Sequence, residues 1–210
     1  MLAPTPSVSD LSSLSTIAEA RDSSDATMAA LLGWVETYLM RGNPDLGRGG
    51  AVCPYTRQAA RLNAVRLGVD LSGPDREEAA FARLRAGFAA LDAIPVAPAM
   101  AHFRTVIIGF PNCAGPEGIA MLQRIQAGHK YHALSRNRMI GLMHDGSEAR
   151  GLWNPDFRPL RAPLPVLAIR QMVEHDAPFA LRHPLLLLPY LARFRMAGMK
   201  RLYAHLRPAR

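Results

Sequence analysis

Two segments of the sequence are dense in side chains that do chemistry, and the first of them surrounds a cysteine. The segment from Asn43 to Tyr55, NPDLGRGGAVCPY, contains three glycines, two prolines, an arginine and Cys53. A glycine-rich loop before a helix can hold an anion through its backbone N–H groups. Cys53 comes just before an expected helix start, where the helix dipole favours the reactive thiolate. Cys53 is therefore a candidate catalytic residue, and a small buried apolar side chain is the alternative.

The second segment contains several arginines held between prolines. It runs from Met139 to Arg170, and its central part reads GLWNPDFRPLRAPLPVLAIR. Prolines restrict the backbone and so hold neighbouring side chains in place. Arginines held in this way are suited to binding carboxylates or phosphates with two hydrogen bonds each. Arg158 and Arg161 are therefore candidate cofactor-binding or substrate-binding residues.

Arg170 differs from the other arginines because it falls inside an expected apolar strand. A buried arginine needs an acidic partner, and Asp156 or Glu174 could supply it. We expect Arg170 to be either a catalytic residue that holds a substrate carboxylate or one half of a structural ion pair. Both interpretations remain open at the level of sequence.

His144 is the best candidate for a metal ligand among the seven histidines, none of which belongs to a zinc-binding motif. It ends an expected apolar strand, where a neutral imidazole could face a pocket, and one histidine is enough to ligate haem iron. A strand-end histidine bonded to a loop carbonyl is the alternative. His129 and His132 share a helix face, but their place near a helix end explains them without a ligand role.

These residues must be positioned by a mixture of strands and helices. The hydrophobic pattern predicts strands over Thr105–Phe110, Met139–His144 and Pro165–Met172, with a brief strand near Val69. Helical spacing is predicted after Asp25, a plausible N-cap, and in several later segments. The connections are too uneven for a repeating βαβ unit, so we expect an α+β fold with a mainly antiparallel sheet covered by helices.

The domain limits follow from composition. Residues 1–25 are rich in Ser, Thr, Asp and Pro and are predicted to form a mobile arm. Residues 26–210 are predicted to form one α+β domain that ends in a basic amphipathic helix from His183 to Leu206, which Pro189 could break. No apolar run approaches the roughly 18 residues that cross a bilayer.

The charge and the motifs exclude several classes of protein. The net charge is +8, and only Lys130 and Lys200 are lysines among the 25 basic residues. No nucleic-acid-binding signature accompanies this charge. The motifs of α/β-hydrolases and of dinucleotide-binding domains are absent. The two cysteines form no CxxC pair, and the N-terminus lacks the pattern of a signal peptide, so we expect a cytoplasmic protein.

The motifs GRGGAVCPY, RTVIIGFPN, GPEGIAMLQ and NPDFRPLRAPLPVLAIRQM resemble an uncharacterised bacterial domain family. Its members look like accessory enzymes encoded near specialised-metabolite genes. More distantly, the order of Cys-Pro-aromatic, helix, apolar strand and Arg-rich strand is similar to the YqcI/YcgG family of haem-dependent N-hydroxylases. Cys53 and Pro54 match the Cys-Pro-Phe motif of that family, with Tyr55 in place of Phe.

The second resemblance implies a haem b cofactor and oxygen chemistry on a small amine or amino acid. We expect Cys53, His144, Arg158, Arg161 and Arg170 to converge on one pocket, with His144 as the haem ligand and Cys53 as the alternative. The competing hypothesis is a non-catalytic protein whose basic C-terminal helix docks on a biosynthetic enzyme. An enzyme predicts a concave arginine-lined pocket, whereas a docking protein predicts an exposed apolar patch beside Arg193, Lys200 and Arg201.

Overall fold

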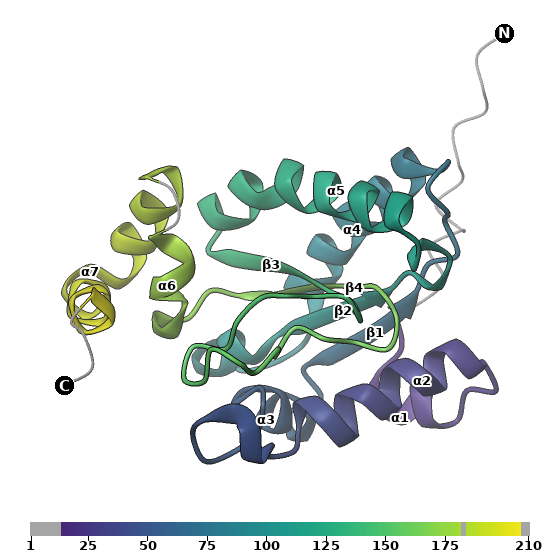
Figure 1. Ribbon diagram of the computed structural model, residues 1–210, viewed down its shortest axis with the longest axis horizontal. Helices are drawn as coiled ribbons and strands as arrows, with labels where there is room; N and C mark the ends of the chain where they lie inside the picture. The colour runs from purple at the N-terminus through teal and green to yellow at the C-terminus, as the bar shows by residue number, and fades with distance from the viewer. Residues whose placement is uncertain (1–13, 182–183, 207–210) are drawn as a thin grey trace, which may run out of the picture.

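The computed structural model describes residues 14–181 and 184–206 and is built around one mixed sheet (Figure 1). The strands are β1 (Val65–Val69), β2 (Thr105–Gly109), β3 (Arg138–Met143) and β4 (Val166–Gln171). Their order is β1-β2-β4-β3. β1 pairs with β2 in parallel, and the other two pairs are antiparallel. The α+β class and the predominance of antiparallel pairing are confirmed. β2, β3 and β4 lie where the hydrophobic pattern predicts them, and β1 begins at Val65, before the brief strand predicted near Val69.

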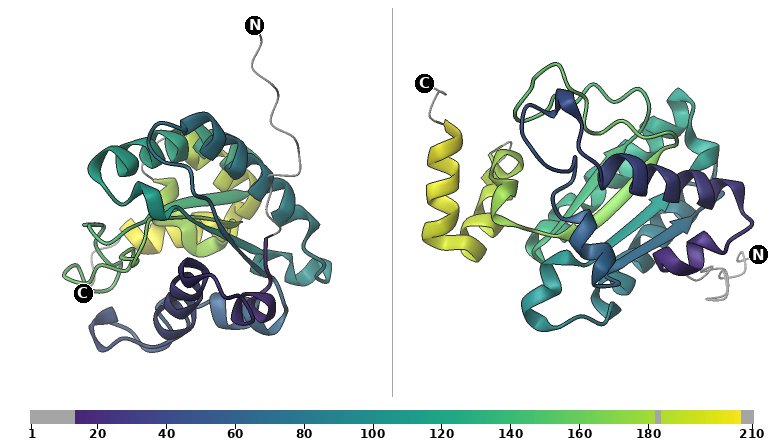
Figure 2. Two further views of the ribbon diagram at one scale, coloured as in Figure 1. Left: turned by 90° about the vertical axis from the view of Figure 1, so that its right-hand side faces the viewer. Right: turned by 90° about the horizontal axis from the view of Figure 1, so that it is seen from below.

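Two long helices cover one face of the sheet (Figures 1 and 2). They are α4 (Glu77–Ala93) and α5 (Pro116–Ser135). Close packing of α4 requires Gly87, because a Cβ there would lie 3.1 Å from the side-chain tips of both Ile108 and Ile169. Between β1 and β2, the chain also forms the 3-10 turn η4 (Pro98–Phe103), and η5 (Pro111–Cys113) precedes α5.

The N-terminal helices cover the other face (Figure 2). They are α1 (Ile17–Arg21), α2 (Ala26–Trp34) with its π-helical continuation η2 (Val35–Leu39), and α3 (Thr56–Arg61). The predicted N-cap Asp25 accepts hydrogen bonds from the N–H groups of Thr27 and Met28. Between η2 and α3 lies a long loop that contains the short turn η3 (Pro44–Leu46).

A smaller unit follows β4 and lies beyond one end of the sheet (Figure 1). It comprises η6 (Glu174–Asp176), α6 (Ala177–Ala180) and α7 (Pro184–Leu206). It has its own apolar cluster, which includes Leu134, Met172, Tyr190 and Leu202. The helix α7 continues through Pro189 and bends instead at Arg195, whose φ of 46° is left-handed.

The N-terminal arm differs from the sequence-based expectation. The predicted arm over residues 1–25 is too long, because Ser15 bridges to Leu67 of β1 and α1 begins at Ile17 with a capping box from Thr16. Residues 1–13 of that arm lie outside the described residues. Among the described residues, no helix has the length and apolarity needed to cross a membrane.

Candidate functional site

The two chemically dense loops of the sequence meet at one side of the domain. They are the segment between η2 and α3 (residues 42–55) and the segment between β3 and β4 (residues 144–165). Asn154 donates a 2.8 Å hydrogen bond from Nδ2 to the carbonyl of Asp45. Gly47 has a φ of 76°, and a Cβ there would lie 2.9 Å from the carbonyl carbon of Trp153. Only glycine satisfies both constraints, so the backbones of the two loops are in direct contact.

Each loop presents an aspartate on the same local turn. The tripeptide Asn-Pro-Asp occurs at Asn43–Asp45 and again at Asn154–Asp156. In both, the Asn Oδ1 accepts a hydrogen bond from the backbone N–H of the Asp, at 2.8 Å and 3.0 Å respectively. This Asx turn holds each aspartate backbone in place.

The preceding helix anchors the second loop with two aromatic side chains. Trp34 and Tyr38 stack on each other four residues apart. The indole Nε1 of Trp34 donates to the carbonyl of Arg161 at 3.1 Å, and the Tyr38 hydroxyl donates to the carbonyl of Arg158 at 3.3 Å. Tyr38 belongs to the π-helical segment η2, a type of irregularity that often marks functional sites. The positions of both arginines are therefore set by one helix.

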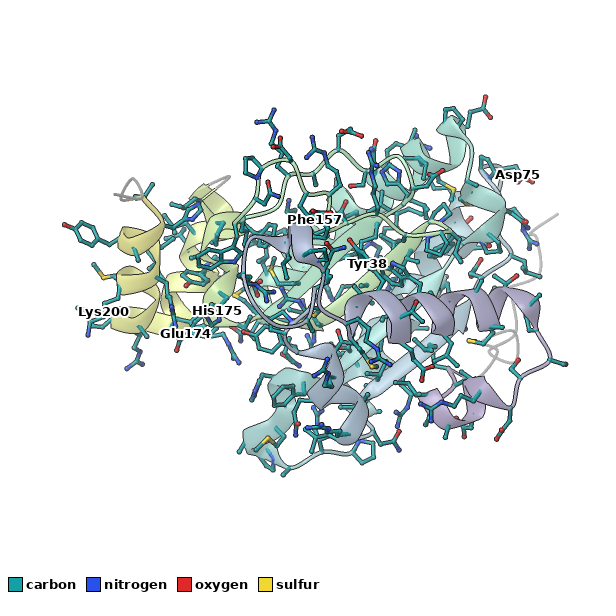
Figure 3. All side chains as sticks on the ribbon, turned by 60° about the horizontal axis from the view of Figure 1, so that its bottom comes forward. Tyr38, Asp75, Phe157, Glu174, His175 and Lys200 are labelled. Carbon is teal, nitrogen blue, oxygen red and sulfur yellow. The ribbon has the colours of Figure 1, made fainter. Side chains whose placement is uncertain are left out.

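A cavity of about 380 Å³ lies between these elements. We call it the loop cavity, and Figure 3 labels two of its lining residues, Tyr38 and Phe157, side by side near the middle of the molecule. Burial raises the pKa of the Tyr38 hydroxyl, and the nearby Arg161 partly opposes this effect. The complete lining is Tyr38, Asp45, Asn154, Asp156, Phe157, Arg158 and Arg161.

The two arginines of the loop cavity share one carboxylate. Glu148 accepts a hydrogen bond from Arg158 Nε at 3.1 Å and another from Arg161 NH2 at 2.8 Å. The bonds from Arg158 and then Arg161 lower the pKa of Glu148. Arg158 NH2 and Arg161 NH1 have no hydrogen-bond partner within the described residues. Each guanidinium is thus oriented by one end and retains donors for a ligand.

A second group of chemical residues surrounds Arg170, and we call it the Arg170 cluster. Arg170 forms a bidentate ion pair with the buried Asp176, which also accepts the N–H of Val173. Burial lowers the pKa of Arg170, but Asp176 outweighs it and the net pKa is raised, with smaller contributions from Cys53 and Tyr55. The cluster therefore contains a nearby thiol.

A tyrosine and a histidine complete the Arg170 cluster. The Tyr55 hydroxyl lies 2.9 Å from Nδ1 of His175, and its ring packs against Phe103. Burial raises the pKa of Tyr55, and Arg170 opposes that rise. The arginine was expected to pair with Asp156 or Glu174, but its partner is Asp176, because η6 turns the chain back towards the end of β4.

Four of the five predicted site residues fall into two groups in the structure, and His144 is described separately below. Cys53 and Arg170 belong to the Arg170 cluster, whereas Arg158 and Arg161 line the loop cavity. Arg170 pairs with Met139 at one end of β3, and the loop that carries the other two arginines leaves β3 after Met143, at its opposite end. Four residues of strand separate these ends by roughly 13 Å. Arg158 and Arg161 line the loop cavity and the other three predicted residues do not, so convergence of all five on one pocket stays a prediction, as do their individual roles.

His144 lies in the loop that carries Arg158 and Arg161 and does not line the loop cavity. It is half-buried, and its backbone N–H donates to the carbonyl of Leu160 at 3.2 Å. Its ring lies over its own turn, since a Cβ at Gly146 would be 3.6 Å from His144 Nδ1. The bond to a loop carbonyl is made by the backbone of His144, so both its ligand role and the alternative of a strand-end histidine bonded to a loop carbonyl stay predictions.

Neither of the two cavities fits haem in the way that the resemblance implies. Haem requires a strong axial ligand, an apolar slot and cations for its propionates. The loop cavity supplies cations, but most of its lining residues are polar or charged, and they include no histidine or cysteine. A second cavity of about 310 Å³ beside α4 also lacks both residue types. Among the described residues, no three His, Cys, Asp or Glu side chains gather into a metal-binding group. We therefore derive no haem-dependent step.

Several residues of the loop cavity were not predicted from the sequence. Tyr38, Trp34, Asp45 and Glu148 were not among the candidate site residues. The repeated Asn-Pro-Asp tripeptide is the signal that could have identified Asp45 and Asp156 together. Nothing in the sequence signals the π-helical segment that presents Tyr38.

The structure contains both features that were expected to separate an enzyme from a docking protein. The loop cavity is concave and lined by arginines. On α7, apolar side chains that include Met196 and Met199 are exposed close to Lys200. Figure 3 shows Lys200 at the end of the molecule away from Asp75, with Glu174 and His175 next to its helix. The two features therefore lie in different parts of the chain.

Comparison with known proteins gives a family without an assigned activity. A family model described as a domain of unknown function, DUF6875, matches residues 28–205. No curated protein and no solved structure matches the chain. The match covers both loops of the cavity, the whole sheet and most of α7. The chain is a member of the DUF6875 family.

Proposed function

We propose that the loop cavity binds a small zwitterionic molecule of the amino-acid class and that this molecule is the substrate of the protein. The observation that carries the proposal is the pairing of two arginines with two aspartates around one cavity. Its volume of about 380 Å³ falls in the range typical of small-molecule sites. A lining with both signs of charge is suited to a ligand that also carries both.

The arginines are suited to the carboxylate of such a ligand. Glu148 already shows that Arg158 and Arg161 can hold one carboxylate together. Their remaining terminal groups can donate to a second carboxylate without breaking the first contact. In this proposal Glu148 is a positioning residue, because it orients both guanidinium groups.

The aspartates are suited to the amine. Asp45 and Asp156 come from different loops, and each has its backbone held by an Asx turn. An ammonium group donates three hydrogen bonds and prefers carboxylate partners. The ring of Phe157 and the hydroxyl of Tyr38 then provide an apolar and a polar contact for the ligand side chain.

The oxygenase reaction remains a separate proposal that rests on the distant resemblance. In that proposal the protein oxidises a small amine or amino acid with haem b as cofactor. Its support is the Cys53-Pro54-Tyr55 motif, which lies in the Arg170 cluster rather than in the loop cavity. A stoichiometric Soret band in protein expressed with a haem precursor would support this proposal. Failure of the purified protein to take up added haemin would rule it out.

Ligand-induced thermal stabilisation tests the proposed substrate class. Purified protein is heated with each of the twenty standard amino acids, and at least one is expected to raise the melting temperature. Arg161→Met should abolish the increase, while Arg85→Met, which removes an exposed arginine on α4, should retain it. Stabilisation of the Arg161→Met variant equal to that of the unmodified protein contradicts the assignment of this cavity.

A further inference from the structure

The second half of α7 exposes an apolar stripe along one side of the helix. Met196, Met199, Tyr203 and Leu206 are 66%, 53%, 58% and 66% exposed. They are three, four and three residues apart, a spacing that places them along one helical face. We call these four residues the α7 face. An apolar stripe of this size on the outside of a domain marks an interaction site.

The opposite side of the same helix is already packed, so the orientation of α7 is set. Leu202 is buried in the small C-terminal cluster. Gly198 allows close contact, because a Cβ there would lie 2.9 Å from Phe194 Cβ and 3.0 Å from Tyr190 Cε1. Rotating the helix to hide its exposed face would break this packing. The α7 face is therefore directed outwards in the folded domain.

The charge of the C-terminal segment has a single sign. From Ala177 to Arg210 the sequence contains no Asp or Glu. Arg193, Lys200 and Arg201 are exposed on α7, and Arg201 forms an ion pair with Glu174 of η6 at 3.6 Å. Lys200 follows Met199 directly, so a cation borders the α7 face. The seven basic residues of the segment are Arg182, Arg193, Arg195, Lys200, Arg201, Arg207 and Arg210.

From this combination we infer that α7 is a membrane-surface helix that binds the headgroups of anionic lipids. Amphipathic helices of this kind lie in the interface with their apolar side inserted and their cations against the headgroups. Lys and Arg near an anionic bilayer each strengthen binding. The helix lies at one end of the molecule's longest axis, where a flat surface can reach it (Figure 1).

Anionic lipid fits the α7 face better than an acidic protein does. Specific protein partners are recognised by a pattern of attractive and repulsive charges, and lysine is depleted at the centre of protein interfaces. Because the segment from Ala177 to Arg210 itself carries only positive charge, it matches instead a surface that is uniformly negative. A second copy of the chain fits less well, because two such helices would bring like charges together.

Sedimentation with vesicles tests the inference on the complete protein. The probes are vesicles of phosphatidylcholine alone and of phosphatidylcholine mixed with an equal part of phosphatidylglycerol. We expect binding to the anionic vesicles only, with weaker binding in high salt. Met199→Glu inserts a charge into the α7 face and should weaken binding by about tenfold or more. Leu71→Glu makes the same change on a residue that is 68% exposed elsewhere, and it should retain binding within about twofold.

Circular dichroism first establishes that both variants are folded. If Met199→Glu has lost helix content, the milder variant Met199→Gln takes its place. Four results overturn the inference. The unmodified protein could fail to bind anionic vesicles, or the two glutamate variants could lose the same affinity, which would show attraction by net charge alone. Binding to soluble polyglutamate that depends on Met199, without binding to vesicles, would assign an acidic protein partner. A dimer that Met199→Glu dissociates would assign the face to a second copy.

Discussion

Replacing Asp176 by asparagine is expected to destabilise the protein more than any other single change to a carboxylate described above. The Asp176 side chain is only 3% exposed, and it receives both terminal nitrogens of Arg170 together with the backbone N–H of Val173. The pair joins the end of β4 to the start of α6. Asparagine keeps the shape but leaves the arginine without its counter-charge.

The expected cost follows from the burial of the two partners. Removing one partner of a buried ion pair costs about 3–5 kcal/mol because an uncompensated charge remains. The Arg170 side chain is 27% exposed and keeps a hydrogen bond to the carbonyl of Gln171, so the low end applies. We expect a loss of about 3 kcal/mol, or roughly 6–12 °C in melting temperature at this chain length.

Glu148→Gln provides the matched control. Its carboxylate also contacts two guanidinium nitrogens, but it is 70% exposed, where ion pairs contribute little. Urea denaturation followed by circular dichroism measures both variants under the same conditions. Equal and small losses for the two variants would refute the reasoning that burial of the Arg170–Asp176 pair determines its contribution to stability.

Four further changes have expected outcomes. Gly47→Ala should lower the free energy of unfolding by about 1–3 kcal/mol, because Gly47 has a positive φ and lies against the backbone of the other loop. Gly49→Ala, whose Cβ would meet nothing within 4 Å, should be nearly neutral, and thermal melts measure both variants. Burial raises the pKa of Tyr190 from 10.0 to about 12, so folding stability falls as the pH rises from about 10 towards 12; Tyr190→Phe should reduce that fall in urea titrations. Glu148 has a pKa below its ordinary value of 4.5, so it stays ionised and orients both arginines down to about pH 4.5. Ligand affinity measured by calorimetry should therefore hold to that pH and decline at lower pH, where Glu148 is protonated. His144→Ala should leave the absorption spectrum of a haemin titration unchanged, and loss of a Soret band in this variant would restore His144 as a ligand.

Much of the fold could be predicted because its elements are locally consistent. The run Thr105–Phe110 is β-branched and apolar, and it forms the central strand β2, which pairs on both sides. The cap at Asp25 follows from its short acidic side chain before a helical pattern. The N-terminal arm was overestimated because composition alone indicated mobility, whereas Ser15 gains its order from a bridge to Leu67 that is distant in sequence.

The candidate site was predictable only in part. Sequence analysis selected the two loops, since both contain unusual densities of glycine, proline and arginine. It could not assign Arg170 to Asp176 rather than to the loop cavity, because that choice depends on the direction of β4 and the turn at η6. The position of Tyr38 in the cavity wall depends on a π-helical segment that cannot be predicted from the residue types. The antiparallel pairing of β3 and β4 places Arg170 at one end of β3 and the loop with Arg158 and Arg161 at the other, although their similar chemistry suggested one site.

Calorimetric titration with ligands that lack one charge is the most direct test of the central claim. The amino acid that stabilises the protein best is compared with its decarboxylated amine and with its deaminated acid. We predict that both analogues bind at least about tenfold more weakly to the unmodified protein. Arg161→Met should lose only the preference for the amino acid over its decarboxylated amine. Asp156→Asn should lose only the preference for the amino acid over its deaminated acid. Equal affinity of the unmodified protein for all three ligands would contradict recognition of a zwitterion in the loop cavity.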